Sequence, residues 1–371
     1  MSLSGVPSTC SRRSTGHRRQ LRRVRFVNRA PKIGLLLINL GTPSSPEVPD
    51  VRRYVRQLLM DERVLDMPAW RRFLLVQLVI VPRRSRRSAA SYQKIWTDRG
   101  SPLLVHGRDL RDLVEAQLGD GVAVELAMRF GEPSIRLALD RLEARGIDLL
   151  VLLPLYAQSS SASTESSVEA VQAELARRTS RLDLEVVPAF YVHPAYLDAK
   201  RRLAAPVLEE VDPDLVLFSF HGLPERQLKA SGLGCLENAG CCSPDTGRRG
   251  CYRAQCLTSA GALAEQLGLA RDQYAVSFQS RLGRTPWIAP FTDEVLAEQA
   301  RRGRRRVVVI SGFVANCLET LEEIRIRGRE IWLQNGGEAF ELVPAPNSSA
   351  AWVKALVEIA GERLVRADRG S

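Results

Sequence analysis

Acidic residues are absent from the first 32 positions of this 371-residue chain, although 26% of all residues are charged. Nine basic residues there carry most of the formal net charge of +11 and leave about +2 for the remainder. They are Arg12, Arg13, Arg18, Arg19, Arg22, Arg23, Arg25, Arg29 and Lys32. A remainder so close to neutrality argues against a basic nucleic-acid-binding face on the folded part. Residues 1–32 have some of the composition of an organellar targeting peptide but lack the apolar run of a secretory signal. We interpret them as an Arg-rich disordered arm, with a misassigned start as the alternative.

The chain also lacks an apolar run long enough to cross a bilayer. The most apolar early stretch, Phe73–Val81, is about half a membrane span. Four arginines follow it closely, at positions 83, 84, 86 and 87. This segment cannot be a spanning helix. An interfacial segment, a ligand-gating segment and a core helix remain open.

Nucleotide-binding signatures are missing as well. The turns Gly41-Thr42-Pro43 and Ser311-Gly312-Phe313 lack the G-x-G-x-x-G spacing that seats a pyrophosphate, and no P-loop is present. A dinucleotide site is therefore unsupported.

Short apolar runs alternate with helix-length amphipathic segments such as Ser134–Arg145 and Tyr196–Val211. The apolar runs are Ile33–Leu40, Val122–Met128, Asp148–Leu155, Leu184–Phe190, Leu215–Phe220, Tyr274–Phe278 and Arg306–Ile310. This alternation predicts βαβ units and a mostly parallel sheet in an α/β fold. Because the second half repeats the style of the first, we divide the chain near Val192, into halves 33–192 and 193–360 with a tail at 361–371.

His221, one of only four histidines, directly follows the apolar run Leu217–Phe220. The pattern predicts a strand that ends at this histidine and leads into a turn. Ligands of α/β proteins bind at the carboxyl ends of strands, and an unperturbed histidine pKa of about 6.5 suits proton transfer near neutrality. The alternative is a turn histidine that only bonds to backbone, and His221 alone does not decide between the two.

A second corner of the same kind follows the run that ends at Ile310. Glu319 and Glu323 are four residues apart, so a helix begun there places them on one face, where carboxylates can bind a hard cation or relay protons. Glu322 should point elsewhere. The alternative is that acids favour a first helical turn because they complement its dipole.

Five of the seven cysteines fall within residues 235–256, inside a Cys-rich insert at 232–256. Without a secretory signal, a metal or cluster is favoured over disulfides, and the irregular spacing favours an iron–sulfur cluster over a structural zinc. We favour four of the cysteines as ligands: Cys235, Cys242, Cys251 and Cys256. Cys241 is the spare, although it could replace either neighbour.

These motifs occur in an order that resembles the ferrochelatase family, whose members insert ferrous iron into a porphyrin at the end of haem synthesis. The resemblance covers roughly residues 33–340. It is carried by Gly34–Pro43, Tyr92–Trp96, Gly100–Leu103, Ala127–Gly131, Leu153–Tyr156, His221–Pro224, Phe278–Gly283 and the Glu319 corner.

The resemblance implies two similar doubly wound, Rossmann-like halves with parallel sheets and a porphyrin cleft between them. It implies that His221 is the active-site histidine and, with Glu319, binds the substrate Fe²⁺. Glu323 then continues the carboxylate path. The substrate-binding residues that it implies are Arg129, Tyr156 and Phe73, and the insert resembles the internal [2Fe-2S] motif of some bacterial members.

The expected reaction is insertion of Fe²⁺ into protoporphyrin IX by a cytoplasmic enzyme that touches the inner membrane, either a monomer or a homodimer. Coproporphyrin III as substrate, a cobalt or sirohydrochlorin chelatase, and a non-catalytic porphyrin or iron–sulfur sensor are the alternatives. The chain departs from the family in Asn316, where an Asp is common, and in lacking a proline often seen after Tyr156. Neither change touches His221 or Glu319.

Overall fold

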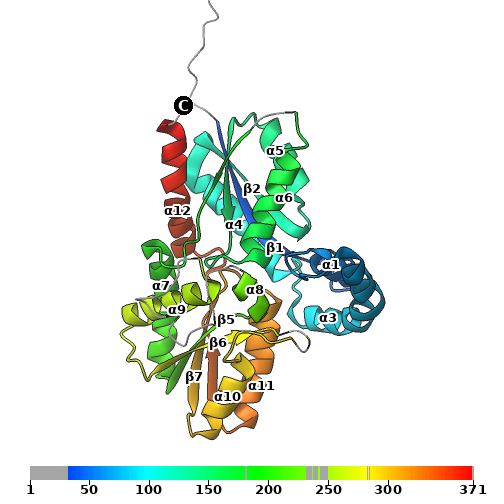
Figure 1. The fold of residues 1–371 in the computed structure, drawn as a ribbon. Coiled ribbons are helices and arrows are strands. Elements are labelled where there is room, and N and C mark those ends of the chain that lie inside the picture. Colours follow the sequence, from blue (N-terminus) through cyan, green and yellow to red (C-terminus); the bar gives the residue numbers. More distant parts are fainter. Residues whose placement is uncertain are drawn as a thin grey trace, which may run out of the picture. The chain divides into compact units, whose positions relative to one another are not determined.

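The computed structural model describes residues 32–179, 182–230, 236, 241–242, 250–281, 283 and 285–369, with side chains described as far as residue 364. Residues Pro31–Ser371 form one compact unit, to which the elements described here belong (Figure 1). Within the described residues, no helix is both long enough and apolar enough to span a membrane. The arm at 1–31 and Cys235 lie outside the described residues.

Two four-stranded parallel sheets organise the described chain. The first has the order β2-β1-β3-β4 and the second the order β6-β5-β7-β8. Their strands are β1 (Ile33–Thr42), β2 (Val122–Gly131), β3 (Leu149–Pro154), β4 (Asp183–Val186), β5 (Leu215–His221), β6 (Tyr274–Gln279), β7 (Arg306–Ser311) and β8 (Ala339–Leu342). All pairings are parallel, so each sheet presents the carboxyl ends of its strands along one edge.

Helices connect the strands in both halves. The α-helices are α1 (Val48–Met60), α2 (Ala69–Leu74), α3 (Val81–Ile95), α4 (Pro102–Leu118), α5 (Ile135–Ala144), α6 (Ser166–Leu175), α7 (Pro194–Val211), α8 (Glu225–Ala230), α9 (Tyr252–Gln266), α10 (Thr292–Arg301), α11 (Arg329–Gln334) and α12 (Ala350–Arg369). Three π-helical segments, η1 (Leu75–Ile80), η3 (Ser161–Glu165) and η4 (Glu319–Gly328), and a short 3₁₀ turn, η2 (Gly119–Gly121), complete the elements.

The predicted α/β fold with parallel sheets is confirmed. All seven apolar runs contain strands, and the two segments expected to be helical form α5 and α7. The eighth strand, Ala339–Leu342, was not predicted, because its four residues form too short an apolar run to stand out.

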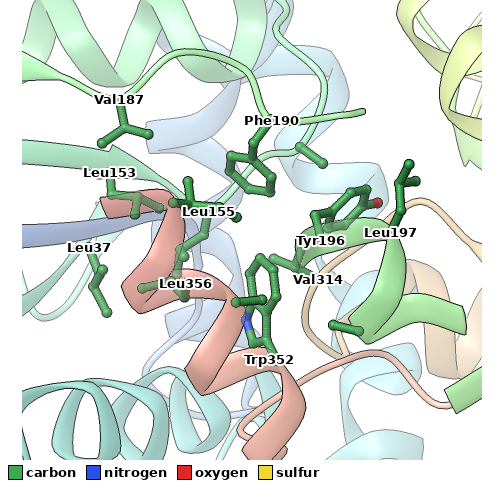
Figure 2. Close-up of a cluster of buried hydrophobic side chains, with 14 of the residues drawn as sticks. Leu37, Leu153, Leu155, Val187, Phe190, Tyr196, Leu197, Val314, Trp352 and Leu356 are labelled. Carbon is green, nitrogen blue, oxygen red and sulfur yellow. The ribbon is translucent and has the colours of Figure 1, made fainter. Parts of the chain in front are cut away.

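The largest core cluster contains residues of both sheets, including Leu37 of β1 and Phe218 of β5. Figure 2 shows a part of it in which Phe190, Tyr196 and Trp352 gather beside leucines of β1 and β3. Phe190 and Tyr196 pack edge to face, with ring centroids 5.5 Å apart. Helix α12 carries Trp352 and contacts α4 and β3 as well as α7, so it joins elements that are far apart in sequence.

Two glycines allow close backbone approaches beside the carboxyl ends of the strands. Gly41 has a φ of 121°, and a Cβ there would lie 1.8 Å from the carbonyl oxygen of Phe130. At Gly312, a Cβ would lie 2.4 Å from the ring of Phe220. Any larger residue would push the loops after β1 and β7 away from the neighbouring strands.

Candidate active site

A cavity of about 540 Å³ opens where the carboxyl ends of both sheets meet helices α1, α3 and η4. Its wall includes Asn39–Thr42 at the end of β1, Tyr156 after β3, His221 at the end of β5 and Glu319 in η4. Segments from both halves of the sequence therefore share one chamber. In open α/β sheets, ligands bind in the crevice at the carboxyl ends of the strands, which is where this cavity lies.

His221 is half-buried at the cavity wall. Its Nδ1 lies 2.6 Å from the carbonyl oxygen of Gly222, and its ring packs edge to face against Phe313. Because a carbonyl oxygen only accepts hydrogen bonds, Nδ1 must carry the hydrogen, and in the neutral ring Nε2 keeps its lone pair. The ring can therefore accept a proton at Nε2.

Glu323 is held by the loop that follows β6. Ser280 donates to its carboxylate twice, from the backbone N–H at 2.9 Å and from Oγ at 2.5 Å. Ser280 has a φ of 69°, which is uncommon for a residue with a side chain. This left-handed backbone aims both donors at Glu323 and fixes the carboxylate at the wall.

Glu319 lies among weakly acidic side chains. Burial raises the pKa of the Cys317 thiol, and the neighbouring Glu319 carboxylate raises it further and hydrogen-bonds to it. Burial and the charge of Glu319 also raise the pKa values of Tyr54 and Tyr92. All four side chains line the cavity, so the surroundings of Glu319 stay neutral and can donate hydrogen bonds.

The expectation that Glu322 points elsewhere is wrong, because Glu322 lines the same cavity as Glu319 and Glu323. The three acids lie in η4, and residues three apart are neighbours on a helix surface just as residues four apart are, so the spacing did not exclude Glu322. Glu322 nevertheless differs from the other two. It is buried, and its carboxylate accepts from Arg327 at 2.9 Å and from Lys94 at 3.4 Å.

Four arginines also line the cavity: Arg84, Arg87, Arg281 and Arg327. Arg281 pairs with Asp293 and Glu294. Across the described part of the chain, Arg84 and Arg87 have no acidic partner within ion-pair distance, and burial lowers the pKa of Arg84, helped by the charge of Arg87. These two guanidinium groups are therefore free to receive anionic groups of a ligand.

Comparisons with known proteins decide the family. Residues 32–364 match the ferrochelatase family along their whole length. The chain belongs to the ferrochelatase family. A ferrochelatase of Coxiella burnetii (strain Dugway 5J108-111) is 45% identical over 337 residues, which cover 90% of this chain and 94% of that protein. A ferrochelatase of Legionella pneumophila (strain Paris) is 43% identical over 332 residues, covering 89% and 99%.

Solved structures with the same fold include SirB from Bacillus subtilis with Fe³⁺, at a TM-score of 0.53 and 10% identity. This likeness covers 89% of this chain and 95% of the other. A sirohydrochlorin chelatase, SirB from Bacillus subtilis subspecies spizizenii in complex with cobalt, gives a TM-score of 0.51, also at 10% identity, over 89% and 94% of the two chains. At this identity the likeness supports the two-lobed chelatase fold alone.

Of the three residues expected to bind the substrate, one lies at the cavity and two lie elsewhere. Tyr156 lines the cavity, with its hydroxyl 3.2 Å from Ser167 Oγ. Arg129 and Phe73 are not part of the cavity lining. Arg129 instead pairs with Asp61 at 2.5 Å and donates to Ser166.

Phe73 lies in α2 with 53% of its surface exposed. The predicted apolar segment is therefore helical, and it presents several large side chains to solvent. Those of α2 and η1 are Trp70, Phe73, Leu74, Leu78 and Val79, which we call the α2–η1 patch.

The described cysteines of the insert lie beside helix α9. Cys251 and Cys256 are buried, and the charges of both Cys251 and Cys242 influence Cys256. Burial raises the pKa of Cys242 to about 11, while Arg253 approaches its sulfur at 3.4 Å. Among the described residues, no three His, Cys, Asp or Glu side chains are gathered closely enough to hold a metal ion. Cys235 lies outside the described residues.

Arg84, Arg87 and Tyr54 line the cavity but were not predicted from the sequence. A signal existed for the arginines, since they are three residues apart in a basic run and so lie on one face of α3. Tyr54 carried no such signal, because its place beside Glu319 depends on how α1 packs against β1 and η4.

Proposed function

We propose that this protein inserts Fe²⁺ into protoporphyrin IX to give protohaem, as a metal chelatase of the ferrochelatase family. The observation that carries the proposal is the shared cavity, which is lined both by a histidine able to accept a proton and by the carboxylates of η4. A free-base porphyrin must lose two pyrrole N–H protons as iron enters, so the reaction requires such a base.

His221 is proposed as the base. The bond from its Nδ1 to Gly222 fixes the tautomer and leaves Nε2 to accept a pyrrole proton. The contact with Phe313 keeps the ring from rotating freely.

Glu319 and Glu323 are proposed to guide the substrate Fe²⁺ and to carry protons away. Carboxylate oxygens hold Fe²⁺ less tightly than thiolate or imidazole groups arranged in a closed site, and a loosely held ion can be delivered to the porphyrin. Glu323 is fixed by Ser280, whereas among the described residues the side chain that interacts with Glu319 most directly is the thiol of Cys317, a weak donor. Glu319 is therefore the better placed of the two to change partners during the reaction.

The porphyrin itself is proposed to lie against apolar and aromatic residues of the cavity, with Tyr156 in the wall. Arg84 and Arg87 are the groups suited to bind its propionates, because they lack acidic partners in the described chain. Protoporphyrin IX carries two propionates and coproporphyrin III carries four. Coproporphyrin III remains the alternative substrate, and an assay with both porphyrins decides between them.

We also propose that Cys235, Cys242, Cys251 and Cys256 hold a [2Fe-2S] cluster. Two observations support it: the thiols of Cys242, Cys251 and Cys256 influence one another electrostatically, and Cys251 and Cys256 are buried. Thiolates are the usual ligands of such clusters, which supply one-electron redox chemistry when bound.

The α2–η1 patch supports a peripheral contact with the inner membrane by a cytoplasmic enzyme. Its exposed side chains are adjacent in sequence, whereas the other large exposed apolar side chains of the described chain, such as Leu113 and Leu137, lie on different helices. An apolar product can be transferred directly to a membrane that the enzyme touches.

The experiment that tests the proposed chemistry is the substitution His221→Ala. The variant should bind protoporphyrin IX with little change, as measured by fluorescence titration, while Fe²⁺ insertion falls by at least about a hundredfold. The matched control is His193→Ala, which removes a histidine at the start of α7 and outside the cavity lining. Retained turnover in His221→Ala would exclude His221 as the base, and porphyrin binding without turnover in the unsubstituted protein would favour the sensor.

A further inference from the structure

Lys200 is buried in α7 without an acidic partner. Only 3% of its surface is exposed, and it lies on the face of the helix that buries Tyr196, Leu197 and Ala204. Lysine is almost never fully buried unless it is paired. Among the described residues, however, no carboxylate lies within ion-pair distance of its Nζ. An apolar side chain would be less costly at this position, so the contacts of Nζ must account for the lysine.

These contacts are two backbone carbonyls at the end of β7 and in the loop that follows it. Nζ donates to the carbonyl oxygen of Ser311 at 2.5 Å and to that of Phe313 at 3.2 Å. A neutral amine has two hydrogens and an ammonium group has three, so both carbonyls can be bonded in either protonation state. One side chain of α7 therefore holds both ends of the turn Ser311–Phe313.

The turn forms part of the cavity wall. Gly312 and Phe313 line the cavity, whereas Lys200 lies outside its lining. Because Lys200 binds the two carbonyls from α7, these oxygens are directed toward that helix and away from the cavity. The ring of Phe313 packs edge to face against His221, with ring centroids 6.4 Å apart. Lys200 thus lies behind the wall and contacts the residue that contacts the candidate base.

From these contacts we infer that Lys200 is a positioning residue for the reaction, and that it acts on His221 through Phe313. Without the donors of Lys200, two buried carbonyls lack a partner, and the turn must rotate to reach other donors. The ring of Phe313 moves with the turn, so the imidazole of His221 loses the contact that restricts its rotation. The inference rests on the proposed role of His221 as the base.

The first test is Lys200→Met, which keeps the length of the side chain and removes the donors. We expect kcat to fall about tenfold, because the base is less well oriented. KM for the porphyrin should change by less than about twofold, because Lys200 does not line the cavity. An unchanged kcat would overturn the positioning role.

Leu139→Ala is the control for lost stability. Leu139 is fully buried in α5 and outside the cavity lining, so its truncation destabilises the fold without touching the turn. At a temperature where both variants stay folded, it should keep the kcat of the unsubstituted protein. An equal fall of kcat in Leu139→Ala would show that lost stability alone explains Lys200→Met.

Circular dichroism shows whether Lys200→Met folds. If it does not, Lys200→Gln takes its place, because its amide can still donate to one carbonyl. The amide nitrogen is one bond closer to α7 and loses the longer contact, to Phe313. The same fall of kcat is expected, and an unchanged kcat would again overturn the inference.

The second test combines Lys200→Met with Phe313→Ala. If Lys200 acts through the ring of Phe313, its substitution should change kcat by less than about twofold once that ring is absent. A tenfold fall that persists in the Phe313→Ala background would exclude the route through Phe313.

The ring of His221 gives a readout that does not require turnover. The chain has four histidines, so their ¹⁵N imidazole signals can be assigned by substitution. The His221 signals should shift in Lys200→Met and stay in place in Leu139→Ala. Unchanged signals in Lys200→Met would refute the positioning, whereas retained turnover in His221→Ala would refute the base, so the two failures are distinguishable.

Discussion

Glu319 and Glu322 line one cavity but should respond differently to the same substitution. Glu319→Gln removes a carboxylate proposed to take part in proton or iron transfer, and turnover should fall by about a hundredfold or more. Glu322→Gln leaves an amide oxygen facing Arg327 and Lys94, so the expected loss is mainly stability, about 1–3 kcal/mol. Steady-state rates and urea unfolding of both variants measure this contrast. Equal losses of turnover would contradict the distinction between the two acids.

Lys200 is a buried cation, in α7, that the sequence did not reveal. Its Nζ donates to the carbonyl oxygens of Ser311 and Phe313, and burial lowers its pKa to about 7. The unfolded chain keeps the ordinary pKa of about 10.4, so between pH 7 and 10 the unfolded state binds more protons than the folded state. Stability contributed by Lys200 should therefore rise with pH through this window and be lowest below pH 7.

The substitution Lys200→Met tests this pH dependence. Between pH 6.5 and pH 9, the unfolding free energy of the unsubstituted protein should increase relative to Lys200→Met by about 2–3 kcal/mol, as measured by urea denaturation. Lys354→Met removes an exposed lysine of α12 and should give no such relative change. A difference between the unsubstituted protein and Lys200→Met that is independent of pH would show that Lys200 is charged throughout the range.

The position of a single site residue could be predicted from the sequence where that residue lies at or soon after the end of a strand. His221 is the last residue of β5, and Glu319 follows the loop after β7, so the edge of the sheet brings them into one cavity. Lys200 and Glu322 were missed or misplaced for a shared reason. Their environments depend on groups distant in sequence, the carbonyls after β7 for Lys200 and the side chain of Lys94 for Glu322.

Among the elements, the segment from α2 to η1 has the most testable role. If the α2–η1 patch contacts a membrane, Leu78→Asp should reduce sedimentation with vesicles containing anionic lipid by about tenfold, because one charge enters the most exposed part of the patch. Leu113→Asp changes another exposed leucine, which lies in α4 outside the patch, and should leave binding unchanged. Equal binding by both variants and the unsubstituted protein would remove the patch as the membrane contact.

The Cys-rich insert before α9 carries a second prediction. Cys242→Ser should lower the iron and sulfide content of the purified protein and bleach the visible absorption of an iron–sulfur centre, because one of four proposed thiolate ligands is lost. Cys317→Ser, in a cysteine outside the insert, should leave both unchanged. Unchanged iron and sulfide in Cys242→Ser would rule out its ligation.

The elements themselves were mostly predictable, because buried parallel strands are continuous apolar runs. The π-helical turns of η1 and η4 were not, since spacing in sequence indicates a helix and does not distinguish a wide turn from a regular one. A regular helix already places residues three apart on one face, so the expectation that Glu322 points elsewhere did not follow from the spacing. Residues of η4 line the cavity, and π-helical turns are frequent at functional sites.

At the scale of the whole molecule, the proposed reaction requires residues from both halves of the sequence to line one site. Residues at the end of β1 and after β3 form one part of the wall, and residues at the end of β5 and after β7 form another. The largest core cluster also contains residues of both sheets. The alternation of strands and helices predicted the two parallel sheets. The division into halves at residues 192 and 193 stays a prediction, and α12 contacts elements on both sides of it.

The measurement that tests the central claim most directly is an anaerobic assay of the purified protein with Fe²⁺ and protoporphyrin IX, with coproporphyrin III in parallel. The account predicts rapid loss of protoporphyrin fluorescence as haem forms, and slower loss with coproporphyrin III. Faster turnover of coproporphyrin III would correct the substrate. No turnover with either porphyrin, despite tight binding of the porphyrin in the cavity, would contradict the chelatase mechanism and favour a sensor.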